Sequence, residues 1–181
     1  KGGRNWYLPS AGELWMIYNN LEDIQTALET VGGQEFVTSW DEDWIMYWSS
    51  TEGSKCAWYL DLDIRDLDRR LFKTCRLKVR PVSKFGPSTL KESFTRKISR
   101  KKNDELIIKA DTAFEIPDGI YILHETLGVK SVNGWNPKNN NGVVGILLIE
   151  DEHKIVVALE NSPVDLFWST QPFSVNAPIG N

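Results

Sequence analysis

Two capped helical segments at the start of the chain restrict its possible folds more than any other feature. Ser10 and Glu13 have the spacing of a capping box, in which the hydroxyl accepts from the first turn and the carboxylate accepts from the serine amide. Apolar residues at helical spacing predict one helix over residues 11–19 and a second over residues 21–31. Gly32–Gly33 follows as a left-handed stop, so both helices precede the strand-like segments of the chain.

Short strands are predicted after these helices. Seven segments alternate or run apolar with β-branched and aromatic side chains, and they are residues 44–50, 57–63, 69–74, 76–82, 117–123, 142–150 and 154–160. Arg65–Asp66 is a plausible turn between the second and third, and the polar run Glu150–His153 predicts a hairpin between the last two. Two helices packed on small antiparallel sheets make an α+β fold.

Length and charge limit the classes of protein. The chain has 181 residues, enough for one domain with a proper core or for two partial ones. Its net charge of −4 gives no overall reason to expect nucleic acid. The most apolar run, residues 142–150, is too short to span a membrane. No metal-ligand spacing or cofactor motif is present, so we expect neither a metal nor a cofactor.

Residues 85–115 differ from the segments around them. They begin with a Gly-Pro step and concentrate basic side chains, namely Lys91, Arg96, Lys97, Arg100, Lys101 and Lys102. A solvated linker or an exposed edge is the simplest interpretation, and an electrostatic contact with an anionic surface is the alternative. The segment divides the chain into residues 1–84, with both helices, and residues 116–181, which are rich in strands.

Four short motifs carry a resemblance to a known family. They are WYLPSAGE at residues 6–13, YWSST at 47–51, AW at 57–58 and VRPV at 79–82. Together they resemble a bacterial family of C-type lectin-like domains of surface and secreted proteins. Formylglycine-generating enzymes and the variable proteins of diversity-generating retroelements share the wider fold. The resemblance implies a C-type lectin-like fold and a location at the cell surface or outside the cell.

The second half resembles an earlier portion of the same family. Residues 142–162 are similar to the hairpin that precedes the capped helix in such proteins, so the halves stand in reversed order here. The halves could form one circularly permuted domain, or they could be pieces of two successive domains. They could also exchange between two copies in a homodimer. We favour completion within the chain or across a dimer, because neither half buries enough surface alone.

Catalytic groups are few. His124 ends a predicted strand and His153 lies in a predicted turn, where packed or exposed roles are more common than catalysis. Cys56 and Cys75 match no motif of the formylglycine-generating enzymes, and they form either one disulfide or two free thiols. The acidic residues Asp61, Asp63, Asp66 and Asp68 fit a solvated, ion-paired strand better than a calcium site. The chain is therefore not expected to be an enzyme.

The eight tryptophans are the better functional lead. Five aromatic residues within or near the family motifs are expected in the core: Trp6, Trp15, Tyr18, Trp48 and Trp58. The other tryptophans lie in loop-like stretches among acids and amides, a combination that suits a carbohydrate site and suits a protein interface equally well. This candidate site consists of Trp40, Asp41, Asp43, Trp44, Trp135, Asn136, Asn139 and Trp168.

The sequence thus predicts a non-enzymatic module that binds a glycan or a protein. The calcium-binding motifs of animal C-type lectins are missing, so the resemblance concerns the fold and not calcium-dependent sugar binding. A structural or assembly subunit, completed by another chain, is the alternative. An enzyme similar to the formylglycine-generating enzymes is the third possibility.

Overall fold

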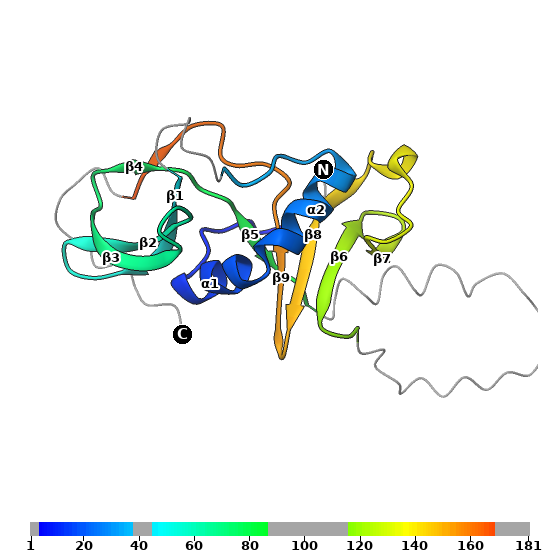
Figure 1. Ribbon diagram of the computed structural model, residues 1–181, viewed down its shortest axis with the longest axis horizontal. Coiled ribbons are helices and arrows are strands. Elements are labelled where there is room, and N and C mark those ends of the chain that lie inside the picture. The colour runs from blue at the N-terminus through cyan, green and yellow to red at the C-terminus, as the bar shows by residue number, and fades with distance from the viewer. Residues whose placement is uncertain (1–3, 38–44, 87–115, 169–181) are drawn as a thin grey trace, which may run out of the picture.

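The computed structural model describes residues 4–37, 45–86 and 116–168 (Figure 1). Helix α1 spans Ala11–Asn19, and both hydrogen bonds of the predicted capping box at its start are present. Helix α2 spans Leu21–Val31 and ends at Gly32, whose φ of 70° is left-handed. The two helices and their ends therefore confirm the prediction from the sequence.

Three antiparallel sheets follow the helices. The three-stranded sheet has the order β1-β2-β3, and its strands are β1 Met46–Glu52, β2 Cys56–Asp61 and β3 Asp66–Phe72. A two-stranded sheet pairs β4 Arg76–Leu77 with β10 Leu166–Phe167. The five-stranded sheet has the order β5-β9-β8-β6-β7, and its strands are β5 Val82–Lys84, β6 Gly119–His124, β7 Gly128–Ser131, β8 Val143–Glu150 and β9 His153–Val157. The α+β class is thus confirmed for the described residues.

The prediction of one strand over residues 76–82 is wrong in one respect. It contains two strands, β4 and β5, which belong to different sheets. Pro81 stands between them, and its ring removes a backbone donor that a continuous strand would need. The short strand β7 was not predicted, because its sequence GVKS has no apolar alternation.

The two halves of the chain share one sheet and one core. Val82 of β5 pairs with Val157 of β9, so the first half supplies the edge strand of a sheet built by the second. Helix α1 packs on β1 and β2, while α2 packs on β6 and β8, and the helices therefore lie between these sheets (Figure 1). The largest buried cluster includes Ile17 and Leu28 from the helices together with Ile146 from β8. Residues from both halves of the chain thus build one sheet and one buried cluster.

Arg80 joins the two halves at the point where the chain passes from β4 to β5. Its guanidinium is fully buried and lies 4.4 Å from the centre of the Phe36 ring. It donates hydrogen bonds to the carbonyl oxygens of Gln34, Glu35 and Ala158 and to Oδ1 of Asn161, at 2.7–3.1 Å. Burial lowers the pKa of Arg80 to about 10, which leaves the side chain charged at neutral pH.

A second buried cation lies beneath the last described strand. Lys73 is fully buried, its ammonium group pairs with the Glu52 carboxylate, and it lies 4.5 Å from the centre of the Trp168 ring. A buried ammonium that loses its carboxylate partner keeps the cost of desolvation without compensation.

We therefore expect Glu52→Gln to lower the free energy of unfolding by about 1–2 kcal/mol, since Glu52 is partly exposed and solvent screens part of the pair. Urea denaturation checks this value. Glu29→Gln, on the exposed face of α2, serves as the control and should change stability by less than about 0.5 kcal/mol. Equal effects of the two substitutions would contradict a stabilising role of the Lys73–Glu52 pair.

Candidate functional site

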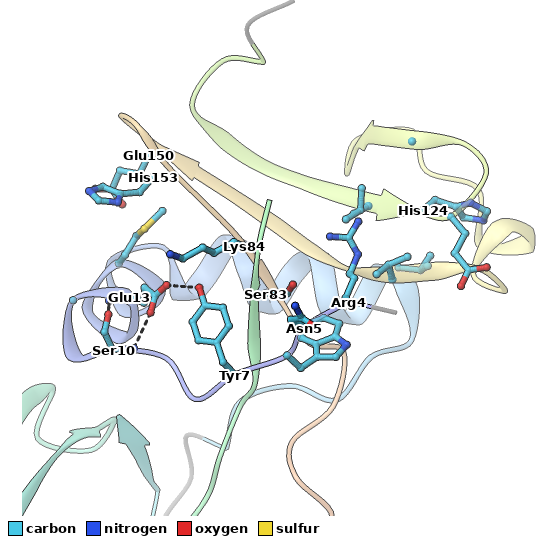
Figure 2. A pocket seen from close by; sticks show the side chains of 18 of the residues that line it. Arg4, Asn5, Tyr7, Ser10, Glu13, Ser83, Lys84, His124, Glu150 and His153 are labelled. Atoms are coloured by element: carbon cyan, nitrogen blue, oxygen red, sulfur yellow. Dashed lines mark hydrogen bonds between the residues drawn. The ribbon is translucent and has the colours of Figure 1, made fainter. Parts of the chain in front are cut away.

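A large open cleft lies between α1 and the five-stranded sheet and reaches from β5 to the ends of β6 and β8. Its volume is about 2060 Å³, and Figure 2 shows it from close by. The lining residues come from the segment before α1 and α1 itself, from β5, from the end of β6, from the start of β8 and from the β8–β9 hairpin. Ser50 of β1 also contributes. The cleft therefore brings together both halves of the chain.

The segment before α1 forms one wall because it pairs with the edge of the sheet. The Tyr7 amide donates to the Val82 carbonyl at 2.8 Å, and the Val82 amide donates to the Tyr7 carbonyl at 3.0 Å. This bridge holds the three preceding residues in the cleft, where Arg4, Asn5 and Trp6 all contribute to the lining. The Trp6 side chain is 39 % exposed, so much of its ring faces solvent.

Helix α1 forms the neighbouring wall. The Glu13 carboxylate accepts from the Tyr7 hydroxyl at 2.7 Å and from the Ser10 amide at 2.7 Å, as the dashed lines in Figure 2 show. Burial, together with the hydrogen bond to Glu13, raises the pKa of Tyr7 above its ordinary value. Trp15, two residues after Glu13 in the same helix, is 40 % exposed, and its ring centre lies 5.3 Å from that of Tyr18.

His124 closes the end of the cleft at β6, and its ring is held by hydrogen bonds. Its Nδ1 accepts from the amides of Thr126 and Leu127 at 3.1 and 3.2 Å, and its Nε2 lies 3.2 Å from the Asn141 carbonyl oxygen. A carbonyl can only accept, so Nε2 carries the proton and Nδ1 is the acceptor. With both ring nitrogens occupied, His124 has no free nitrogen to act as a general base.

The loop before β8 uses its polar groups internally. The Trp135 indole donates to Oδ1 of Asn140 at 2.8 Å, and its ring lies 6.0 Å from the His124 ring. The Asn136 side chain accepts from the Lys138 amide and caps the 3₁₀ turn Pro137–Asn139, so its role here is structural. Three residues of this loop were predicted to bind a ligand, namely Trp135, Asn136 and Asn139. Of these three, only the exposed Asn139 makes no side-chain hydrogen bond to the described residues.

Trp168, also predicted for binding, lies at the opposite side of the molecule from this loop. Its indole donates to the Ser49 carbonyl at 2.7 Å, and its ring packs with the cluster around Trp48. The remaining predicted residues, Trp40, Asp41, Asp43 and Trp44, fall outside the described residues, as do the basic side chains of the segment 87–115. The two described tryptophans of the predicted set, Trp135 and Trp168, pack against different buried clusters.

The expectation that Trp6 and Trp15 belong to the core is wrong. Trp48 is buried and Tyr18 and Trp58 are partly buried, but Trp6 and Trp15 are exposed beside the cleft. For Trp15 a signal was available, because the apolar stripe of α1 runs through Leu14 and Ile17 and leaves the position after Leu14 outside it. No comparable signal existed for Trp6.

The cysteines and the acidic residues considered from the sequence do not form a disulfide or a metal site among the described residues. Cys56 and Cys75 are free thiols, so the disulfide alternative does not occur in this structure. Asp61 is buried rather than solvated, because its Oδ1 accepts from the amides of Asp63 and Ile64 in the turn after β2. Among residues 4–37, 45–86 and 116–168, no three His, Cys, Asp or Glu side chains gather as a metal site would require.

Comparisons with known proteins add no relative. Neither a protein-family model nor a curated protein nor a solved structure matches the chain. Within the described part of the chain, no helix is long and apolar enough to cross a membrane. Conclusions about function therefore depend on the cleft itself.

Proposed function

We propose that the chain is a non-catalytic carbohydrate-binding module with a C-type lectin-like fold, part of a bacterial surface or secreted protein. The observation that carries this proposal is the exposure of Trp6 and Trp15 beside one cleft that is also lined by polar side chains. Sugars present apolar faces surrounded by hydroxyl groups, and aromatic rings bind those faces while polar side chains bind the hydroxyls.

The size of the cleft favours an extended ligand. Sites for small molecules usually enclose about 300–1000 Å³, whereas this cleft has about 2060 Å³ and is open to solvent. Its lining offers side-chain amides on opposite sides, with Asn5 before α1, Asn19 at the end of α1 and Asn141 before β8. A glycan chain that lies along the cleft would find both aromatic surfaces and hydrogen-bonding groups along its length.

The test is a glycan-array screen of the purified chain, repeated with calcium and with a chelator, followed by titration of each hit. We expect Trp6→Ala and Trp15→Ala each to weaken binding about tenfold or more, a loss of about 1.4 kcal/mol. Trp135→Phe is the matched control and should leave affinity unchanged, because its indole bonds to Asn140 instead of facing the cleft. The same hits should appear in both solutions.

Other results would point to the alternatives. No hit in either solution would contradict the carbohydrate proposal and favour recognition of a protein. Concentration-dependent association in sedimentation experiments would then favour the assembly role. Loss of binding in Trp135→Phe but not in the cleft variants would place the site in the loop before β8.

A further inference from the structure

The cleft contains two cations that have no carboxylate partner within the described residues. Arg4 and Lys84 both line it, and neither forms an ion pair with residues 4–37, 45–86 or 116–168. Burial lowers the pKa of the Arg4 guanidinium, which means that the charged group has lost part of its hydration. A partly desolvated guanidinium without an acid partner gains from binding an anion.

The carboxylates of the cleft are engaged or lie elsewhere. Glu13 is used by Tyr7 and Ser10, and Glu150 accepts from the Asn20 side chain at 3.1 Å. In Figure 2, Glu13 and Glu150 gather with His153 at the end of the cleft near α1, while Arg4 and Asn5 lie beside Ser83 toward His124. Glu125 and Asp151 also line the cleft but are exposed, so water and salt screen their charges.

Three successive residues that line the cleft offer a ligand different chemical groups: Arg4 a guanidinium, Asn5 an amide and Trp6 an indole. A guanidinium binds a carboxylate through two parallel hydrogen bonds, an amide binds hydroxyls and an indole covers the apolar face of a pyranose ring. A sugar ring that carries both hydroxyls and a carboxylate uses all three. Lys84 of β5 also lines the cleft, but it is exposed and extends toward Glu13 in Figure 2, so Arg4 is the cation beside Asn5 and Trp6.

From this arrangement we infer that the cleft selects acidic glycans, chains that contain uronic acids, with Arg4 binding the sugar carboxylate. This inference depends on the proposed carbohydrate binding. It identifies the sugar carboxylate, which a neutral glycan lacks, as the group that the cleft recognises. A sulfated chain has similar charge but no planar carboxylate, and it separates specific recognition from general attraction between charges.

The experiment compares each acidic polysaccharide with its own neutral derivative. Polygalacturonate, alginate and hyaluronan are titrated into the full chain by calorimetry, beside the same polymers after reduction of their carboxyl groups. Heparin with its carboxyl groups reduced serves as the sulfated polymer. We expect at least one uronate chain to bind tenfold or more tightly than its reduced form, and more tightly than the sulfated polymer.

Two variants test whether Arg4 causes the preference for acidic chains. Arg4→Gln should reduce the ratio of the two affinities to about one, whereas Arg65→Gln, in the exposed turn before β3, should leave that ratio unchanged. Thermal unfolding checks that both variants are folded.

Equal affinity for acidic and reduced chains would overturn the acidic preference and leave carbohydrate binding in place. A preference that persists in Arg4→Gln, or that extends equally to the sulfated polymer, would overturn the role of Arg4. The absence of binding to every acidic and neutral chain would overturn both proposals.

Discussion

Gly145→Ala is expected to destabilise the protein by about 3 kcal/mol or more. Gly145 lies in β8, between β6 and β9, and is buried. A Cβ atom at this position would lie 2.5 Å from the Val157 carbonyl oxygen and 2.7 Å from Cγ1 of Val156. Because backbone cannot rotate away as a side chain can, β8 and β9 would have to separate.

Chemical denaturation measures this effect, and Gly12→Ala is the matched control. Gly12 lies in the first turn of α1, and no heavy atom lies within 4 Å of its added Cβ. The same substitution should therefore raise stability by about 0.5 kcal/mol, because alanine reduces the freedom of the unfolded chain. A Gly145→Ala variant as stable as the wild-type chain would show that the β8–β9 contact is looser than described.

Arg80→Met is expected to cost about 3 kcal/mol or more. The substitution leaves the carbonyl groups of Gln34, Glu35 and Ala158 without their donor, and the first two of these follow α2. It also removes the hydrogen bond to Asn161, and the segment after β9 then keeps only its backbone bonds to Val79 and Pro81 in this region. Methionine fills much of the volume but supplies no donor.

Two further variants show whether the loss of stability in Arg80→Met comes from its hydrogen bonds. Arg65→Met replaces the same side chain in an exposed turn and should change stability by less than about 0.5 kcal/mol. Arg80→Lys should recover only part of the loss, because one ammonium group cannot reproduce the planar set of donors. Should Arg80→Met unfold at the same denaturant concentration as Arg65→Met, the guanidinium would not join the halves.

The elements with local signals could be predicted from the sequence. The capping box of α1, the left-handed glycine after α2 and the polar turn at Glu150–His153 each depend on neighbouring residues, and the structure contains all three. The assignment of residues 76–82 to two sheets could not be predicted. Pro81 is a local signal for the break, but the pairing of β4 and β5 with different sheets depends on partners distant in sequence, Leu166–Phe167 and Ile155–Val157.

The candidate site was less accessible to sequence reasoning. Tryptophans in loop-like segments were expected to face a ligand, but Trp135 and Trp168 find acceptors in Asn140 and Ser49 that no local pattern indicates. Trp6 and Trp15 lie in or near a family motif, and a motif shows which residues recur without showing which are buried. Trp6 is exposed beside Tyr7, which pairs with Val82 at the edge of the five-stranded sheet, and Trp15 is exposed because it lies outside the buried stripe of α1.

The most direct measurement of the central claim is an NMR titration that follows the indole N–H signals of the eight tryptophans while a bound oligosaccharide is added. Trp6→Phe and Trp15→Phe assign the two signals of the cleft. If the cleft is the carbohydrate site, those two signals shift saturably, and the signals of Trp48, Trp135 and Trp168 stay in place. Shifts confined to other tryptophans, with Trp6 and Trp15 unchanged, would contradict the claim.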